Sequence, residues 1–356
     1  MLNICFTFDY ELFFGKNYGS YDEILFEPTN RLVNMLTEEQ TSATFFADAC
    51  SVTQSKKYNQ VEYVDKFTKQ IQELYKKKQD IQLHIHSHWL KSSYNNGAWE
   101  FDKDSYRIHS FGFERNQDDN AYGIIKKGVE YLASTLKEIN PNYCCIAYRA
   151  GGFTIQPHEK LIDTLYDCGI RVDSSIAPGL KSCSLTNSYD YTHSITNENW
   201  KISSKREWWE DSTGDEKTLY EIPIATENKN PLFFTMKRIF LPNEIKLKLG
   251  EKKGSYINES GDKNIKSIEA IWKYVSGYNA ISMDAYNAEY IFKMLRRYYQ
   301  KHNCKEKDCT VAIIGHPKLV NDVYIENLRR LILMIRGDRN IKIMNIMEAY
   351  NNIGEK

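Results

Sequence analysis

Residues 81–89 read IQLHIHSHW and place three histidines, His84, His86 and His88, on alternate positions. The apolar residues before His84 predict a β-strand. Side chains alternate along extended backbone, so a strand running through all three positions sends the three rings to one face. A strand that ends at His84 and turns instead brings His84 and His88 together. Imidazole is the commonest biological metal ligand, since it is neutral near pH 7. Either geometry favours a metal site over histidines that are merely buried and hydrogen-bonded.

Strand and helix patterns alternate on both sides of this stretch. Apolar runs rich in β-branched and aromatic residues predict strands at 4–8, 44–47, 80–84, 143–148, 170–173, 219–224, 310–314 and 341–344. Apolar residues at helical spacing predict helices at 29–38, 62–78, 122–139, 156–168, 283–301, 324–335 and 346–352. This order predicts a parallel sheet with crossover helices, either open or closed into a barrel.

Polar residues gather where the predicted strands end. They are Asp9, the histidines from His84 onward, Arg149, Asp173 and His316. In parallel α/β folds the active site forms at the carboxyl ends of the strands. We therefore expect these side chains to converge on one site.

Two stretches, from Ser87 to Asn120 and from Asp190 to about Ala280, break the alternation and are polar or irregular. Long loops of this kind usually border a binding site. We interpret the chain, residues 1–356, as a single domain with insertions near 89–120 and 185–280 around the pocket.

Composition limits the function classes. The 356 residues include 47 Lys and Arg against 47 Asp and Glu, which gives none of the basic excess that nucleic-acid binding requires. The first residues lack a signal-peptide pattern, and no run approaches the roughly 20 apolar residues of a membrane span. We expect a cytoplasmic protein without a transmembrane segment; the oligomeric state stays open.

The chain resembles the polysaccharide deacetylase family, the NodB-homology group also called carbohydrate esterase family four. The resemblance rests on short motifs in the family's order, each at a predicted strand end: Thr7-Phe8-Asp9-Tyr10-Glu11, His84-Ile85-His86-Ser87-His88, Arg149-Ala150-Gly151-Gly152-Phe153, Asp173-Ser174-Ser175 and Ile313-Ile314-Gly315-His316. It implies a distorted (β/α) barrel with long loop insertions and a metal-dependent deacetylase activity.

The resemblance also implies roles for individual residues. Asp9 matches the general base, Arg149 the residue that pairs with and orients it, His316 the general acid and Asp173 the partner of that acid. His84 and His88 match metal ligands. The family's usual third ligand is the second Asp of Asp-Asp, where this chain has Tyr10. Glu11 takes that role by analogy with members that space the two carboxylates one residue apart.

Some assignments stay open. Asp9 itself and His86 are alternative ligands. Gly151 replaces the family's proline in the third motif, which leaves the geometry of that loop open. Arg149 and Asp173 are alternatively a buried ion pair, and His316 a strand-end cap.

The expected cofactor is one divalent metal ion, zinc first, with nickel, cobalt or iron as alternatives. Such an ion polarises a carbonyl and lowers the pKa of bound water toward about 7. Asp9 then takes the proton of the water, and His316 protonates the leaving amine. We predict a metal-dependent carbohydrate deacetylase that acts on an N-acetylated sugar or glycan, an intermediate of surface-glycan synthesis.

Other functions remain alternatives to the deacetylase. One is hydrolysis of another small amide or ureide on the same scaffold. A catalytically inactive glycan-binding protein is a second. A glycosidase that uses Asp9 and another carboxylate is a third.

Overall fold

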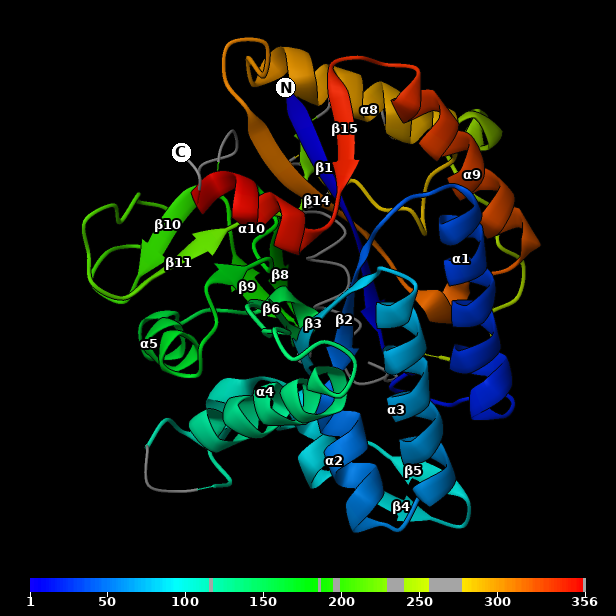
Figure 1. The fold of residues 1–356 in the computed structure, drawn as a ribbon, viewed down its shortest axis with the longest axis vertical. Coiled ribbons are helices and arrows are strands. Elements are labelled where there is room, and N and C mark those ends of the chain that lie inside the picture. Colours follow the sequence, from blue (N-terminus) through cyan, green and yellow to red (C-terminus); the bar gives the residue numbers. More distant parts are fainter. Residues whose placement is uncertain (115–117, 185–186, 195–198, 229–239, 256–276, 355–356) are drawn as a thin grey trace.

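The computed structural model describes residues 1–114, 118–184, 187–194, 199–228, 240–255 and 277–354. Its centre is a curled nine-stranded sheet with the order β10-β11-β7-β6-β3-β2-β1-β14, in which β15 also pairs with β1 (Figure 1). All neighbouring strands run parallel except β10 and β11. The strands are β1 (Leu2–Tyr10), β2 (Thr44–Asp48), β3 (Asp80–Ile85), β6 (Ala147–Ala150), β7 (Val172–Asp173), β10 (Trp200–Ser203), β11 (Thr218–Glu221), β14 (Cys309–Gly315) and β15 (Ile341–Met344).

Strand β1 is the centre of the arrangement. Strand β14 runs along one edge of it from Leu2 to Phe8. On the other edge, β15 pairs with residues 2–5 and β2 with residues 7–10. Beyond β11, the Ala225 N–H donates to the Ala312 carbonyl of β14 (2.7 Å), so the two ends of the curled sheet meet. The predicted distorted (β/α) barrel is confirmed.

Helices surround the curled sheet, with α10 at the amino end of the barrel and the others on its outside (Figure 1). They are α1 (Glu27–Glu38), α2 (Ala49–Lys57), α3 (Val61–Lys76), α4 (Ala121–Lys137), α5 (Glu159–Asp167), α8 (Ala288–Lys301), α9 (Asp322–Arg336) and α10 (Ile346–Gly354). In α3, apolar residues three and four apart, such as Phe67, Ile71 and Leu74, form one buried stripe, as its sequence predicts. Burying each such side chain contributes about 1.5–3 kcal/mol.

One predicted helix begins later than its sequence pattern indicates. The apolar periodicity starts at Met283, but α8 starts at Ala288. The Asn287 side chain accepts a hydrogen bond from the Tyr290 N–H (2.9 Å) and fixes the helix start there. Residues 283–286 are therefore free to form a loop beside the sheet.

The two faces of β1 have different neighbours. Leu2, Ile4, Phe6, Phe8 and Tyr10 point outward and pack in the core beneath the helices. The alternate residues point into the barrel. At its amino end, Cys5 and Ala312 pack with Ile346 and Ala349 of α10 in a separate apolar cluster. Helix α10 thus fills the amino end of the barrel and leaves the carboxyl end to polar residues.

Short hairpins and turns accompany the central sheet, and the predicted insertion near 185–280 also contributes β10 and β11 to that sheet. The hairpins are β4 (Ser93–Asn95) with β5 (Ala98–Glu100), β8 (Lys181–Cys183) with β9 (Ser188–Asp190), and β12 (Thr226–Asn228) with β13 (Tyr278–Ala280). Single-turn helical segments are η1 (Asp22–Phe26), η2 (Ser87–Lys91), η3 (Ile108–Phe111), η4 (Gly151–Phe153), η5 (Pro242–Glu244) and η6 (Pro317–Leu319). Residues 229–239 and 256–276 of the second insertion lie outside the described residues. Within the described ranges, no helix is both long enough and apolar enough to cross a bilayer.

Candidate active site

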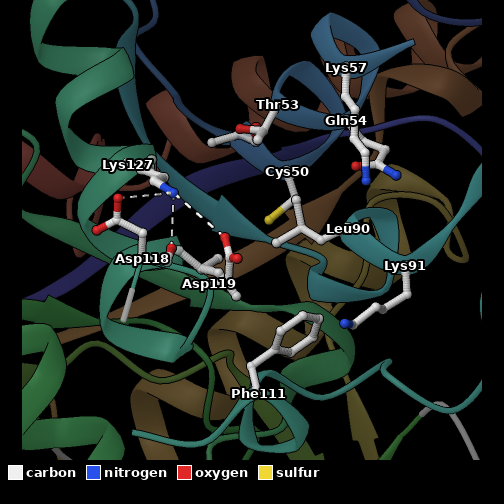
Figure 2. A pocket seen from close by; sticks show the side chains of 13 residues that line it. Cys50, Thr53, Gln54, Lys57, Leu90, Lys91, Phe111, Asp118, Asp119 and Lys127 are labelled. Carbon is white, nitrogen blue, oxygen red and sulfur yellow. Dashed lines mark hydrogen bonds and ion pairs between the residues drawn. The ribbon is translucent and has the colours of Figure 1, made fainter. Parts of the chain in front are cut away.

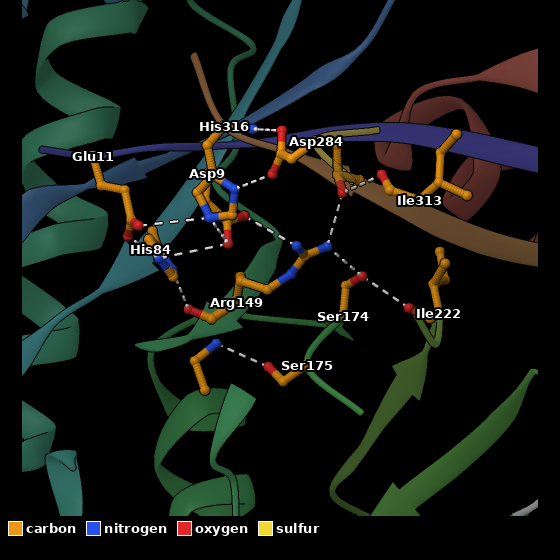
Figure 3. A network of polar contacts seen from close by, with 12 residues as sticks. Asp9, Glu11, His84, Arg149, Ser174, Ser175, Ile222, Asp284, Ile313 and His316 are labelled. Atoms are coloured by element: carbon orange, nitrogen blue, oxygen red, sulfur yellow. Dashed lines mark hydrogen bonds and ion pairs between the residues drawn. The ribbon is translucent and has the colours of Figure 1, made fainter. Parts of the chain in front are cut away.

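Polar side chains from β1, β3, β6 and the residue after β14 meet inside the carboxyl end of the barrel (Figure 3). Asp9, His84 and Arg149 are buried, and the His316 side chain is 18% exposed. The strand-end residues thus converge as the sequence predicts, with the exception of Asp173.

Glu11, His84 and His86 form a compact group of potential metal ligands. Their ligand atoms all lie within 4.8 Å of one another. Glu11 Oε2 is 3.0 Å from His84 Nε2 and 2.7 Å from His86 Nε2. A carboxylate with two imidazoles matches the ligand types that zinc and related divalent ions take in catalytic sites.

The hydrogen bonding of His84 supports this interpretation. Its Nδ1 lies 2.8 Å from the Arg149 carbonyl, which can only accept, so Nδ1 carries a proton. Nε2 then faces Glu11 either as a lone pair, which a cation between them would satisfy, or as the N–H of an imidazolium. Metal-bound histidines commonly donate their other nitrogen to a backbone carbonyl in this way. The donor set and this tautomer fit a divalent ion.

The pKa directions of the group reflect opposing effects. Burial disfavours the charged form of His84, but Asp9 and Glu11 outweigh it and raise its pKa to about 9. Burial lowers the pKa of His86 to about 4. Burial favours a higher pKa for Glu11, but Lys318 and the two histidines outweigh it and hold the pKa of this carboxyl well below its usual range. Glu11 is therefore ionised and His86 neutral, the states in which they bind metal, whereas His84 carries an Nε2 proton that a bound cation would displace.

The structure brings His86, rather than the predicted His88, to Glu11 and His84. Strand β3 ends at Ile85, and His86 (φ −109°, ψ 86°) stands just before η2, where its ring reaches Glu11 beside that of His84. From Ser87 the chain turns into η2, and the His88 ring stacks on Tyr106 with centroids 4.4 Å apart. The His88 ring is a neighbour of the His86 ring, with the two centroids 5.4 Å apart. In the described residues, neither His88 ring nitrogen has a hydrogen-bond partner.

One carboxylate oxygen of Asp9 is paired with Arg149, and the other faces the histidines of the site. Arg149 Nη1 donates to Asp9 Oδ1 (3.0 Å), while Nη2 donates to the hydroxyls of Thr7 and Ser174 (3.1 Å each). Asp9 Oδ2 is 3.9 Å from His84 Nε2 and 3.9 Å from His316 Nε2. The predicted ion pair between Arg149 and Asp9 is present.

His316 is paired with Asp284, and the predicted partner, Asp173, is wrong. His316 Nδ1 lies 2.6 Å from Asp284 Oδ2, and the His316 backbone N–H donates to Asp284 Oδ1 (3.0 Å). Ser282 bridges Ile314 of β14, which places Asp284, two residues later, beside His316. Burial opposes the imidazolium, but Asp284 outweighs it and raises the pKa of His316.

The contacts of Asp173 in the described residues are with Ser175 and Glu221, not with His316. The Asp173 carboxylate accepts from the Ser175 hydroxyl (2.7 Å). Burial, together with Asp173, raises the pKa of Glu221 well above its usual range, so the two carboxyls form a pair that retains a proton.

Sequence reasoning also missed Lys318. Its side chain is fully buried, and Nζ donates to Glu11 Oε1 (2.6 Å) and to the Leu12 carbonyl (3.1 Å). The ammonium also lies over the rings of Phe13 and Phe14, at 5.2 and 5.1 Å from their centroids. Lys318 occupies Oε1, which leaves Oε2 as the Glu11 oxygen that faces the histidines. Neither residue has a sequence signal of its own: Asp284 follows the mixed stretch Ala280-Ile281-Ser282-Met283, and Lys318 stands two positions after His316.

Gly151, which replaces the family's proline, lets the loop after β6 approach His86. A Cβ at Gly151 would lie 2.6 Å from the Ile85 carbonyl oxygen and 2.8 Å from His86 Nδ1. Any side chain there would displace the histidine or the loop. Gly151 therefore belongs to the packing that positions His86.

No family model matches the sequence. The structure resembles that of a protein from Mycobacterium smegmatis assigned as a polysaccharide deacetylase, with 11% identity, a TM-score of 0.50, and coverage of 99% of this chain and 90% of the other. A second protein with a TM-score of 0.50 is the 4-alpha-glucanotransferase of Thermococcus litoralis, at 10% identity and with 98% of this chain matching 40% of that one. A further protein assigned as a polysaccharide deacetylase, from Pseudomonas aeruginosa PAO1, matches with 11% identity, a TM-score of 0.47, and coverage of 98% and 89%. The predicted resemblance to the polysaccharide deacetylases is confirmed in the fold.

Proposed function

We propose that the protein is a metal-dependent deacetylase that hydrolyses the acetyl amide of an N-acetylated sugar. One observation carries the proposal. A buried carboxylate-arginine pair, Asp9 with Arg149, and a histidine-carboxylate pair, His316 with Asp284, both border the group Glu11, His84 and His86. Amide hydrolysis needs a general base for the water, a general acid for the leaving amine and an electrophile that polarises the carbonyl, all around one position.

Glu11, His84 and His86 are the residues proposed to hold the ion, with zinc as the first candidate and nickel, cobalt or iron as alternatives. When bound, a divalent ion supplies a Lewis acid for the amide carbonyl and lowers the pKa of water toward about 7. The two histidines and the single Glu11 oxygen Oε2 form a three-ligand set of the kind that leaves a position open for water or substrate.

Asp9 is the proposed general base. Arg149 holds Oδ1 through its Nη1, which fixes the plane of the carboxylate. Oδ2 is then the oxygen that accepts a proton from the attacking water. Because Arg149 is itself held by the hydroxyls of Thr7 and Ser174, the position of Asp9 is set by a buried network rather than by solvent.

His316 is the proposed general acid. Its Nδ1–H is held by Asp284, so Nε2 points toward Asp9 and Glu11, at 3.9 Å from Asp9 Oδ2 and 3.7 Å from Glu11 Oε1. The carboxylate stabilises the imidazolium, which can give its Nε2 proton to the departing amine. The partial exposure of His316 supports a role at the solvent-facing side of the active site, where the leaving sugar is expected.

The proposal is tested by metal analysis and acetate release on one preparation. We expect one divalent ion per chain, and chelator-sensitive acetate release from N-acetylated oligosaccharides or nucleotide-linked N-acetyl sugars, the forms in which surface-glycan intermediates occur. Restoring zinc should restore release. Free sugar without acetate would indicate a glycosidase. Bound metal without acetate from any sugar would favour another amide or ureide substrate, or a binding protein. Failure to bind metal under any loading would refute the proposal.

A further inference from the structure

The two histidines that face Glu11 are supported in different ways. His84 Nδ1 lies 2.8 Å from the Arg149 carbonyl, a contact that fixes the orientation of the His84 ring. In the described ranges, His86 Nδ1 has no hydrogen-bond partner. The His86 ring packs against Phe14, with the two centroids 4.2 Å apart. The position of His86 must therefore be set by packing and through its backbone.

Asp48 holds the backbone of His86. It is the last residue of β2, is fully buried, and stands beside His84 in the register of β2 and β3. Asp48 Oδ1 accepts from the His86 N–H (3.3 Å) and from the Cys50 N–H (3.2 Å) in the first turn of α2. One carboxylate oxygen thus joins the start of α2 to the residue that carries the second imidazole.

The first turn of α2 fixes Asp48 in turn. Asp48 is the N-cap of this helix, with extended backbone (φ −73°, ψ 90°). The Ser51 hydroxyl donates to the Asp48 carbonyl (2.7 Å), and the Tyr63 hydroxyl of α3 donates to the Ser51 oxygen (3.0 Å). All three residues are buried. Asp48 is therefore held from outside the group Glu11, His84 and His86, as a residue that positions His86 must be.

Hydrogen bonds connect α2 and η2 where packing between them is incomplete. Gln54 Nε2 donates to the Ser92 carbonyl (2.6 Å), just after η2. A cavity of about 260 Å³ is lined by Cys50 and Gln54 of α2 and by Leu90 and Lys91 of η2 (Figure 2). Atoms that face a cavity lack packing contacts on that side. The bond from Asp48 to His86 therefore contributes more to the placement of this turn than it would in a filled interface.

We propose that Asp48 is a positioning residue of the metal site: by accepting the His86 N–H, it holds His86 Nε2 at 2.7 Å from Glu11 Oε2. Asp48 acts through the backbone of His86. Capping of α2 explains the bond to Cys50 but not the bond to His86, which lies 38 positions along the chain. The inference rests on the proposed function, since it takes His86 to be a metal ligand.

The test measures metal binding rather than turnover. Zinc affinity is determined by chelator competition, and the absorption bands of the cobalt(II)-loaded protein report the geometry of the ligands. Asp48→Ala should weaken zinc binding by about 10–100-fold, the usual effect of losing a group behind a ligand, and should shift the cobalt bands. Asp48→Asn keeps an acceptor oxygen at the same point and should retain both the affinity and the bands of the parent protein.

Two further variants separate positioning from helix stability. The Asn120 side chain caps α4 by accepting from the Gly123 N–H (3.0 Å), so Asn120→Ala removes an N-cap elsewhere in the chain. It should lower the melting temperature and leave the zinc affinity and the cobalt bands unchanged. Asp48→Ser offers α2 a favoured capping residue, but its side chain is one bond too short for the His86 N–H. It should keep the melting temperature and still lose zinc affinity.

The outcomes distinguish the role of Asp48 from the metal site itself. Parent-like zinc affinity in Asp48→Ala or Asp48→Ser, or equal losses in Asp48→Ala and Asn120→Ala, would overturn the role of Asp48 and leave the proposed site standing. An equal loss in Asp48→Asn and Asp48→Ala would also overturn it, because the charge and not the bond to His86 would then be responsible. No zinc binding by the parent protein would refute the proposed function and this inference together.

Discussion

Lys318 Nζ lies 2.6 Å from Glu11 Oε1, while Oε2 of the same carboxylate faces His84 and His86. The buried ammonium therefore compensates the charge of Glu11 and holds its plane, with or without a cation at the histidine side. Removing one partner of a buried ion pair leaves the other charge uncompensated, which costs about 3–5 kcal/mol.

Lys318→Met should lower the thermal stability of the metal-free protein strongly and that of the zinc-loaded protein much less, because a cation then takes over the compensation of Glu11. The measurement is the melting temperature of each form, with and without zinc. Lys127→Met is the control, since its ammonium is solvent-exposed and lies 3.9 Å from Asp118 and Asp119, a pair worth less than about 1 kcal/mol. An equal zinc-induced rise in Lys318→Met and wild type would contradict the compensating role of Lys318.

His86→Ala and His88→Ala should differ in bound metal. His86 Nε2 is 2.7 Å from Glu11 Oε2, whereas the His88 ring stacks on Tyr106. Loss of a group behind a ligand already costs about 10–100-fold in metal affinity, so loss of His86 itself should exceed about 100-fold. Chelator competition on the two variants gives the result. Metal loss from His88→Ala alone would restore the ligand set predicted from the sequence.

Asp9, in β1, and Glu11, directly after it, should separate catalysis from metal binding. We expect Asp9→Asn to keep its metal and lose about 10²–10⁴-fold in kcat, the typical contribution of a general base. Glu11→Gln should lose the metal, because the amide offers a neutral and weaker ligand. Metal content and acetate release are measured on the same samples. The opposite pattern would make Asp9 the ligand.

Asp284→Asn should shift the alkaline limb of the pH–rate profile to lower pH. Asp284 raises the pKa of His316, so its loss lowers that pKa. An acid that must be protonated then stops working at a lower pH, and kcat/KM falls earlier as the pH rises. Asp173→Asn, made on the carboxylate that contacts Ser175 instead of His316, should leave the position of that limb unchanged. A shift of the limb in Asp173→Asn and not in Asp284→Asn would return Asp173 to the role that the sequence suggested.

Local patterns were sufficient for the residues at the ends of regular strands. Asp9 and Glu11 share a face because β1 alternates in and out of the barrel, and Arg149 follows from the position of β6. Whether His86 or His88 lies beside Glu11 and His84 depends on where strand β3 ends, because a shift of one or two residues changes which ring faces them. Strand ends are the part of a strand that local sequence patterns predict least well.

Asp284 and Lys318 could not be found in this way. Asp284 depends on the bridge between Ser282 and Ile314, an irregular pairing that local periodicity does not encode. The apolar periodicity instead predicts a helix from Met283, whereas the cap at Asn287 sets the actual start of α8. Lys318 is a buried lysine, a rare state that only the long-range contact with Glu11 explains.

The central position of β1 has a consequence for how the chain is made. Glu11 and the lysine that compensates it are 307 positions apart, and β1 pairs along its length with β14 and β15. At typical synthesis rates of about 5–20 residues per second, β1 waits roughly 15–60 s for these partners. During that interval β2 is already available to pair with residues 7–10 of β1, but the partners of residues 2–8 on the β14 side and of residues 2–5 on the β15 side are missing. The proposed metal site therefore has the charge that compensates Glu11 only after residue 318 has been made.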